Sequence, residues 1–517
     1  MKKINSILMI LAAAAGFTNC SKAELVENKE TEKGGTVVYA STDVATKTTL
    51  ADDYKVLWST GDQIKFVKDG ATTTTYTFTL LSGEGTTNGT FTYAQTPEDG
   101  TYTVYYPATY DGTSWPAQTY VDATDISGAP MKATATVSGG SVSDISFKNE
   151  GGILRYTVKG SKTIKSINVK SGSTLDVTLS CGTSGVALST EGTVFNIALP
   201  AGEYSNATLT FTATDNTVAT KTASTFTVKK NKVSLATFEA TALSFALPGL
   251  FTVGKGADGI AGTGDDVQVR FSKGNLYAKN EGTTESPDWK WHFYDEQYQY
   301  NSLSTSSSRT ANANDTEIDL FTWGYDNTSK NNSYSLNPVN TTGITGHDAE
   351  GNKQLNPSAG GDDWGVAYCE SNNITVGTWR TLSTAEWQYL FNTRSNASSL
   401  YKCGVIVCGK ANCVVLLPDN WDLTAHPLQT SYDTESSEGS PMTWEQAEAA
   451  GAVCLRAAGY RDRPNVGYVG VIGIYWSSTA YGRDNAYYVN VDSEGVSPGN
   501  YVSRFYGCSV RLITESK

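Results

Sequence analysis

Histidine is the scarcest ionisable residue in this sequence, with only three among 517 residues. His292, His347 and His426 stand in unrelated polar stretches, none of them beside a candidate nucleophile. A Ser/His/Asp triad needs a base next to its nucleophile, and a zinc site needs four ligands at close spacing. The sequence therefore predicts no hydrolytic centre, no zinc centre and no cofactor.

Runs of basic residues are also lacking. The chain has 39 Lys and Arg against 52 Asp and Glu, which gives a net charge of -13. Nucleic acids attract basic patches, so this balance excludes them as the expected partner. Residues 254–259 formally match GxGxxG, but no helix follows, so this glycine loop cannot cradle a pyrophosphate.

Long apolar runs are absent after the N-terminus. Lys2 and Lys3 precede the run ILMILAAAAGF, which is too short to cross a bilayer and is typical of a signal peptide. The cysteine that soon follows makes the segment resemble a bacterial lipoprotein signal. We expect residues 1–19 to be the signal peptide, Cys20 to be lipidated, and residues 20–34 to be a flexible tether to the outer membrane.

Short alternating strands fill residues 35–241. Residues 35–142 contain TVVYA, YKVLWS, DQIKFV, TTYTFTLL, GTFTYA and TYTVYYP, separated by Gly, Asp, Asn and Pro. Residues 143–241 contain ISFKNEGGILRYTVKG, IKSINVKS, TLDVTLS, TVFNIALPAGEY, ATLTFTATD and ASTFTVKK. Strands at this spacing without intervening helices predict two β-sandwich domains.

A linker over residues 242–249 leads to a region of different texture. Residues 250–517 are rich in aromatic residues, Asn and Ser, and they hold most of the tryptophans. A helix over residues 444–450 is predicted by the capping pair Thr443 and Gln446 and by the stop at Gly451. With strands around AVCLRAAGY, IYWSST, AYYVNV and CSVRLI, these features indicate an α+β domain with two short helices.

The other predicted helix lies in GTWRTLSTAEWQYLFNTR, residues 377–394. Ser383 and Glu386 match a capping box, and Leu382 can pack on Trp387 as a hydrophobic staple. Arg380, Glu386 and Trp387 thus have structural roles, and we interpret them as a helix start and not as a catalytic site.

Cysteines are concentrated in the last third of the chain: Cys369, Cys403, Cys408, Cys413, Cys454 and Cys508. In an exported domain such clustering predicts disulfides, with free buried thiols as the alternative. CGVIVCGKANCVVLL is typical of a hairpin with its turn at residues 409–412, which would bring Cys408 opposite Cys413. The pairing of the other cysteines stays open.

A glycine-rich acidic loop, GKGADGIAGTGDD, carries Asp258, Asp265 and Asp266. Carboxylates on a flexible loop suit calcium, but the spacing misses the EF-hand pattern. We therefore favour a solvated hairpin, with calcium as the alternative, and predict no metal site.

Several motifs in the first two domains resemble the fimbrillin (type V pilin) family: Thr46-Lys47-Thr48, Trp58 to Ile64, Tyr105-Tyr106-Pro107, Leu154-Arg155-Tyr156, Ile164 to Ile167 and Ile197 to Gly202. This resemblance implies export as a lipoprotein and assembly with other fimbrial subunits by donor-strand β-augmentation. It also implies removal of the first strand by a trypsin-like protease, for which Lys47 is the best-placed residue.

The region after residue 250 resembles the C-type-lectin-like domains of the formylglycine-generating-enzyme and variable-protein group. The matching segments are Trp379 to Trp387, Phe271 to Leu276, Asp319 to Gly324, Leu417-Pro418-Asp419, Ala457 to Arg461, Tyr475 to Ser478 and Gly507 to Leu512. The enzymes of that group need two cysteines, with four residues between them, near the C-terminus. Cys508 stands there alone, and the Cys403, Cys408, Cys413 series with this spacing lies elsewhere, so we do not expect an enzyme.

The stretch from Tyr475 to Arg511 interleaves Tyr with Asn, Ser, Gly, Asp and Arg, which is the chemistry of adaptable binding surfaces. In the resembling variable proteins this part faces the ligand. The ligand-binding candidates are Tyr481, Arg483, Asp484, Asn485, Tyr487, Asn500, Tyr501, Arg504 and Tyr506, whereas Trp476, Val489 and Val491 are expected in the core.

The sequence thus predicts a mainly β chain, with two pilin-type β-sandwiches followed by a C-type-lectin-like α+β domain. We expect a fimbrial tip or accessory adhesin at the cell surface that binds an extracellular glycan or protein. The alternatives are a non-polymerising outer-membrane glycan-binding lipoprotein and, disfavoured, a formylglycine-generating-type oxidase.

Overall fold

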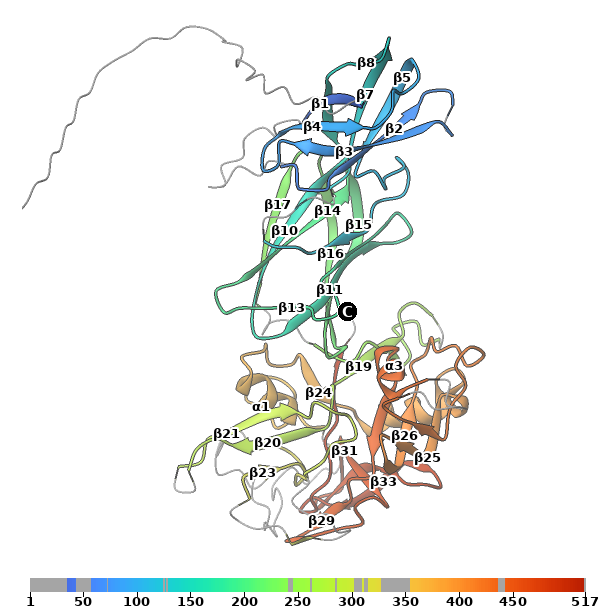
Figure 1. The fold of residues 1–517 in the computed structure, drawn as a ribbon. Coiled ribbons are helices and arrows are strands. Elements are labelled where there is room, and N and C mark those ends of the chain that lie inside the picture. The colour runs from blue at the N-terminus through green and yellow to red at the C-terminus, as the bar shows by residue number, and fades with distance from the viewer. Residues whose placement is uncertain are drawn as a thin grey trace, which may run out of the picture.

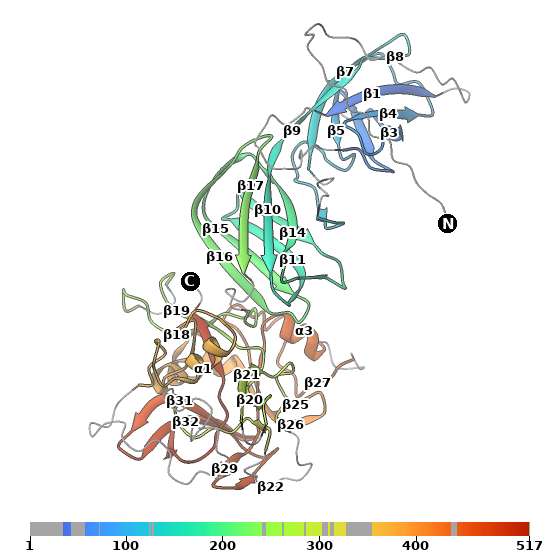
Figure 2. The ribbon, with the colours of Figure 1, turned by 90° about the vertical axis from the view of Figure 1, so that its left-hand side faces the viewer.

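The fold is mainly β, as predicted, and is known from a computed structural model (Figure 1). The structure describes residues 35–42, 57–71, 73–123, 126, 129–239, 245–260, 263–283, 286–301, 309–310, 315–326, 354–435 and 442–515. The predicted signal peptide, Cys20, the tether and Lys47 lie outside these residues. The described part forms three units that lie end to end (Figure 1, Figure 2).

The first unit is one sheet with the strand order β5-β2-β3-β4-β1-β9-β7-β8. Because β5 pairs with β7 as well as with β2, this sheet closes on itself in the manner of a barrel. Its strands are β1 (Thr36–Thr42), β2 (Gln63–Lys68), β3 (Thr75–Ser82), β4 (Asn88–Tyr93), β5 (Gly100–Tyr106), β7 (Met131–Ser138), β8 (Ser141–Val142) and β9 (Ile145–Asn149).

Aromatic side chains fill the interior of this unit. Trp58 is 1% exposed, and its ring lies 4.9 Å from that of Phe91 and 5.3 Å from that of Tyr106, both in edge-to-face geometry. Although YKVLWS was predicted as a strand, Trp58 and Ser59 lie outside the strands. Trp58 is held by the ring packing of the core and by two backbone hydrogen bonds, in which its amide donates to the Thr86 carbonyl oxygen at 3.0 Å and its carbonyl oxygen accepts from the Gly85 amide at 2.8 Å.

The predicted boundary at residue 143 is wrong by one strand. β9 pairs in parallel with β1 and antiparallel with β7, so it belongs to the first unit. Ile145 and Phe147 are buried in the same core as Trp58. Alternation shows that β9 has one buried face, but it cannot show which core that face joins.

The second unit consists of two facing sheets, as predicted for a β-sandwich. One sheet has the order β14-β10-β17 and the other β16-β15-β11-β12-β6, with β13 paired to β11. The strands are β6 (Gln118–Thr119), β10 (Gly151–Lys159), β11 (Thr163–Ser171), β12 (Leu175–Ser180), β13 (Val186–Ala187), β14 (Thr193–Pro200), β15 (Gly202–Ala213), β16 (Val218–Val228) and β17 (Val233–Glu239).

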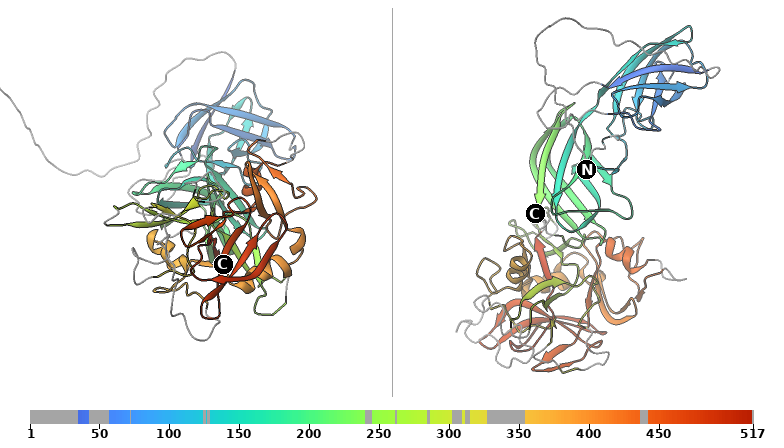
Figure 3. Two further views of the ribbon diagram at one scale, coloured as in Figure 1. Left: turned by 90° about the horizontal axis from the view of Figure 1, so that it is seen from below. Right: turned by 60° about the vertical axis from the view of Figure 1, so that its left-hand side comes forward.

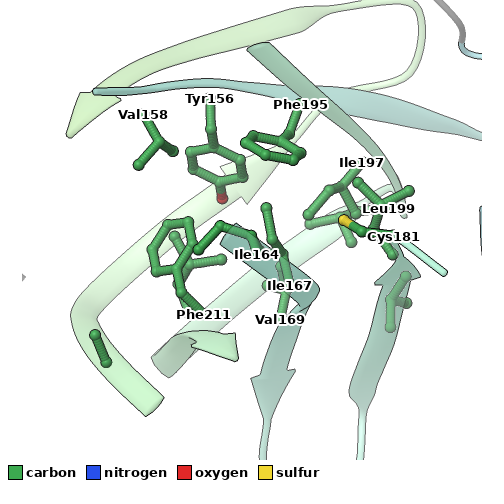
Figure 4. Packing of buried hydrophobic residues seen from close by; sticks show 14 of the residues in the cluster. Tyr156, Val158, Ile164, Ile167, Val169, Cys181, Phe195, Ile197, Leu199 and Phe211 are labelled. Atoms are coloured by element: carbon green, nitrogen blue, oxygen red, sulfur yellow. The ribbon is translucent and has the colours of Figure 1, made fainter. Parts of the chain in front are cut away.

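The side chains between these two sheets form a continuous apolar core (Figure 4). Tyr156 and Phe195 from one sheet face Ile164, Ile167 and the other residues of the opposite sheet. These inward positions alternate with more exposed ones along β11 and β12, which is the pattern that the sequence showed.

The first two units are joined by more than the chain. β6 comes from residues that precede β7 of the first unit, yet it pairs in parallel with β12 of the second. Trp115 Nε1 and Gln118 Nε2 both donate hydrogen bonds to the carbonyl oxygen of Ala198, at 2.9 and 2.8 Å. Residues 115–119 therefore fasten the first unit onto the second.

The third unit, here called the head, consists of the described residues between 245 and 515, and within them three helices pack among small sheets. The helices are α1 (Trp364–Ser371), α2 (Thr384–Gln388) and α3 (Trp444–Ala449), with short turns η4 (Tyr389–Thr393) and η5 (Ala397–Ser399). One sheet has the order β18-β19-β34-β24, namely β18 (Phe251–Gly254), β19 (Val267–Phe271), β34 (Leu512–Glu515) and β24 (Trp379–Thr381).

Four further sheets complete the head. Their orders are β21-β20-β23, β22-β30-β29, β27-β25-β26-β28 and β31-β32-β33. Their strands are β20 (Leu276–Asn280), β21 (Trp289–Phe293), β22 (Arg309–Thr310), β23 (Glu317–Ile318), β25 (Tyr401–Val407), β26 (Lys410–Leu416), β27 (Ser431–Tyr432), β28 (Val453–Arg456), β29 (Tyr460–Asp462), β30 (Asn465–Gly467), β31 (Gly473–Tyr481), β32 (Asn485–Val491) and β33 (Val496–Ser503).

Both predicted helices are present, as α2 and α3. The helix α1 was not predicted. Four consecutive residues of α1, Trp364 to Ala367, are buried, so this helix lacks the one-sided apolar pattern of a surface helix. Among the described residues, no helix has the length and the apolar composition that crossing a membrane requires.

The head meets the second unit through backbone and side-chain contacts. Val218 and Ala246 exchange two backbone hydrogen bonds, of 2.7 and 3.0 Å. Lys273 Nζ donates to the carbonyl oxygen of Asp215 at 3.0 Å and also forms an ion pair with Glu448 of α3. The C-terminal end of the described chain lies at this junction (Figure 3).

The burial of Trp58 leads to a stability prediction. Trp58→Ala should lower the free energy of unfolding of the first unit by about 3–5 kcal/mol, because it opens a cavity between Phe91 and Tyr106. Urea titration of the purified chain, followed by circular dichroism, measures this. The adjacent Leu57 is 45% exposed, so Leu57→Ala should change little; equal effects of the two changes would contradict the packing described.

Candidate functional site

The helix start around Ser383 is formed as predicted. The Ser383 hydroxyl accepts a hydrogen bond from the Glu386 amide, and the Glu386 carboxylate accepts one from the Ser383 amide, which completes the capping box. Arg380 donates two hydrogen bonds to the same carboxylate, at 2.6 and 3.0 Å. Burial would raise the pKa of Glu386, but the bonds from Arg380 and Ser383 outweigh burial and lower it.

A buried carboxylate next to this cluster was not predicted. Asp363 caps α1 by accepting from the Gly365 amide at 2.8 Å, and it also accepts from the amide and hydroxyl of Thr381. Complete burial raises the pKa of Asp363 to about 6 despite these hydrogen bonds. Asp363 links α1 to β24, and every contact it makes is structural.

Two exposed tyrosines, Tyr481 and Tyr501, and the half-buried Tyr487 form a compact cluster on the β31-β32-β33 sheet. The rings of Tyr481 and Tyr501 stack at a centroid distance of 3.9 Å, and Tyr487 meets Tyr481 edge-to-face at 5.1 Å. Tyr481 is 37% exposed and Tyr501 is 52% exposed. A hydrogen bond with Tyr501 raises the pKa of Tyr481, so the Tyr481 phenol is neutral at physiological pH. We call these three residues the tyrosine surface.

Strand register explains why these rings meet. Tyr487 lies directly opposite Tyr501 on β33, and Tyr481 lies opposite Asn485, two positions from Tyr487 on β32. Residues two apart on a strand share a face, so all three rings stand on one side of the sheet. Ala480 and Ala486 point to the other side, where they are fully buried.

Four polar candidates lie near these rings in the sequence. Arg483, Asp484 and Asn500 are exposed, and Asn485 is half-buried. Asn485 is also engaged, because its side-chain oxygen accepts a hydrogen bond from the Ser503 hydroxyl at 3.3 Å. Asn500 pairs with Tyr488 and so lies on the opposite face of the sheet from the Tyr487–Tyr501 pair, which leaves Arg483 and Asp484, in the β31–β32 turn, as the exposed polar groups next to the tyrosine surface.

Two sequence-predicted candidates do not belong to the tyrosine surface. Arg504 is 2% exposed: its guanidinium lies 4.5 Å from the Trp323 ring and donates to the carbonyl oxygens of Asn485 and Gly482. It supports the β31–β32 turn from within. Tyr506 is half-buried and lies 5.8 Å, ring to ring, from Tyr460 in a separate aromatic group.

The predicted disulfides are absent, since all seven described cysteines are free thiols. The predicted hairpin exists as β25 and β26, but its turn is Cys408-Gly409, both with positive φ. The register therefore sets Val405, and not Cys408, opposite Cys413. Cys508 is fully buried, and burial raises its pKa well above that of an ordinary thiol.

The acidic loop uses its carboxylates internally. Asp258 accepts from the Ile260 amide at 2.7 Å, and Asp265 accepts from the Thr263 hydroxyl at 2.7 Å and from the Asp258 amide at 3.1 Å. In the part of the chain that the structure describes, no three His, Cys, Asp or Glu side chains are grouped to hold a metal ion.

Sequence reasoning missed an aromatic stack on the β20–β21 hairpin. The Tyr277 ring lies 4.3 Å from that of Tyr294 and 5.3 Å from that of His292. Tyr277 and His292 are cross-strand partners, and His292 and Tyr294 are two residues apart on the same side. The alternation of aromatic residues in WKWHFYD was the signal that could have indicated a shared face.

Comparisons with known proteins give only distant similarities. No protein-family model matches the chain, and no curated protein matches it. Similar solved structures include a candidate cell adhesion protein from Bacteroides uniformis (17% identity, 42% of this chain, 97% of that chain, TM-score 0.23). A fimbrial protein from Bacteroides ovatus is 12% identical and matches over 93% of this chain and 99% of its own, with a TM-score of 0.22. At such TM-scores these similarities carry no argument.

Asp363 gives the head a specific pH dependence. Its pKa of about 6 exceeds the value of about 3.9 for an unfolded aspartate, so the folded chain binds the proton more tightly. Asp363 should therefore make unfolding easier as pH rises from about 4 to about 6, by about 3 kcal/mol across that window.

Urea titrations of wild type and Asp363→Asn at several pH values isolate this contribution. The difference in unfolding free energy between the two proteins should change between pH 4 and pH 6 and stay constant above pH 7. A difference that is independent of pH would contradict the raised pKa of Asp363.

Proposed function

We propose that this chain is a cell-surface fimbrial protein, a tip or accessory subunit, whose head binds an extracellular glycan or protein. Its N-terminus would be lipidated at Cys20 and would anchor the chain to the outer membrane during or after export. The observation that carries the proposal is the tyrosine surface on the head. The end-to-end β units support it, since they would hold the head away from the membrane (Figure 1).

The tyrosine surface has the composition of a recognition surface. Tyrosine rings supply rigid contact area at a low entropic cost, and their hydroxyls donate and accept hydrogen bonds. Arg483 and Asp484 are exposed in the turn that follows Tyr481 and add both charge signs. A C-type-lectin-like head, which the sequence motifs suggest, would use this C-terminal sheet to face its ligand.

A groove in the second unit supports assembly with other subunits. In the described part of the sandwich, β17 pairs only with β10, and β16 pairs with β15 and, at its first residue Val218, with Ala246, so the edge of β17 and the edge of β16 beyond Val218 have no strand paired to them. Between them lies an apolar cavity of about 350 Å³, whose lining includes Leu154, Phe226 and Leu235. Leu235 is 55% exposed. A strand from another subunit could pair with a free edge and cover these side chains.

The tyrosine surface predicts loss of binding in a targeted variant. The triple change Tyr481→Ala, Tyr487→Ala and Tyr501→Ala should reduce binding of the full chain to glycan or host-protein arrays at least tenfold, because hot-spot aromatic contacts contribute at least about 2 kcal/mol each. Tyr468→Ala is the matched control, since Tyr468 is 52% exposed on the head but lies apart from these rings.

Unchanged circular dichroism would establish that the triple variant is folded. Binding that survives the triple change, or that Tyr468→Ala removes equally, would mean that the tyrosine surface is not the ligand site.

The groove predicts a separate effect on assembly. Leu235→Lys should abolish co-purification of the chain with fimbrial shaft subunits, because a charge in the groove opposes burial under an added strand. Leu81→Lys is the control, since Leu81 is 63% exposed in the first unit and away from the groove. If the wild-type chain never co-purifies with a shaft, the non-polymerising lipoprotein becomes the better account.

A further inference from the structure

A cleft of about 290 Å³ lies where the second unit meets the head. The second unit contributes Ser161, Lys162 and Asp215, and the head contributes Tyr277 and Asn372, among others. This volume is near the lower end of small-molecule pockets, which hold about 300–1,000 Å³, and such pockets favour domain interfaces. The tyrosine surface and the groove of the second unit do not contribute to the lining.

One side of the cleft is aromatic and rigid. The stack of His292, Tyr277 and Tyr294 lines it, and the Tyr294 hydroxyl is held by a 2.7 Å hydrogen bond to Glu317. Burial raises the pKa of Tyr294, so it stays a neutral phenol. Phe293, which stacks on Tyr368 at 3.9 Å, extends the lining. Rings held in this way offer apolar area without loss of side-chain entropy on binding.

The other side of the cleft is polar. Lys162 and Asp215 form an ion pair of 2.6 Å whose side chains are 39% and 36% exposed, so both keep hydrogen-bonding capacity toward the cleft. Burial would raise the pKa of Asp215, but the charge and hydrogen bond of Lys162 lower it, so Asp215 stays an acceptor. Ser161 adds a hydroxyl that is exposed.

The charges around the cleft cancel. Its lining contains two lysines, Lys162 and Lys273, and two aspartates, Asp215 and Asp295. Burial lowers the pKa of His292, so this ring is neutral at pH 7. An anionic or cationic ligand would therefore gain no net attraction to offset the hydration that its charge loses in the cleft. An uncharged ligand has no charge to desolvate and would leave the ion pair intact.

We propose that this cleft binds an uncharged sugar of one or two rings. A pyranose has an apolar face of C–H groups that suits the aromatic side, and hydroxyls that donate to Asp215 and accept from Lys162. Because the lining comes from both units, a bound sugar also holds the head in one orientation on the second unit. The proposal is independent of the tyrosine surface.

Ligand-observed NMR and calorimetry on the full chain test the proposal. The probes are galactose, glucose, mannose, fucose, N-acetylglucosamine and lactose, with glucuronic and N-acetylneuraminic acids as anionic comparators. At least one neutral probe should bind, the acids should bind at least tenfold more weakly, and Tyr277→Ala should weaken the neutral probe at least tenfold.

Two further variants separate the cleft from the other surfaces. Ser161→Trp should block binding by filling the cleft while keeping its aromatic side, whereas Ser141→Trp, on an exposed hairpin of the first unit, should not. The Tyr481→Ala, Tyr487→Ala, Tyr501→Ala variant should bind the neutral probe as wild type does. The proposal is overturned if no neutral probe binds, if the acids bind equally well, or if Ser161→Trp has no effect.

Discussion

The insertion of β34 between β19 and β24 is the contact on which the head depends. Leu512 and Ile513 of β34 are fully buried, and the strand joins segments more than a hundred residues apart in sequence. Just before it, the buried Arg511 donates to Asn275 at 3.2 Å and to Gln297 at 2.7 Å. A buried guanidinium is tolerated only where such partners are present, so this network specifies one arrangement of the strands around it.

The tyrosine surface follows from how far α2 reaches across the neighbouring sheet. Tyr475 and Val489 are covered by the apolar core that includes Trp387 of α2, and both are buried. Further along the same side of β31 the cover ends, and Tyr481 is exposed. One face of one sheet is thus core at one end and accessible surface at the other, and a register shift in β31 between Trp476 and Ala480 separates the two ends.

Local signals predicted much of this fold. The capping boxes at Ser383 and Thr443 form as expected, because each needs only residues three positions apart. β7 was not predicted: its side chains alternate between buried and exposed, but half of them are Ala or Thr, whose contrast in hydropathy is weak. The cysteine hairpin was predicted with the wrong turn. The turn sets the register of the two strands, and the register decides whether two cysteines lie opposite each other and can form a disulfide.

The sequence alone determined where many of the strands lie, where two of the helices begin, and that tyrosines and polar residues gather near the C-terminus. These properties depend on neighbours within a few positions along the chain. Only the tertiary structure decided that β9 joins the first core, that Arg504 lies under Trp323 while Tyr481 and Tyr501 stay exposed, and that Lys162 and Tyr277 line one cleft. Each of these depends on which faces pack together, and alternation within a strand carries no information about the partner of a face.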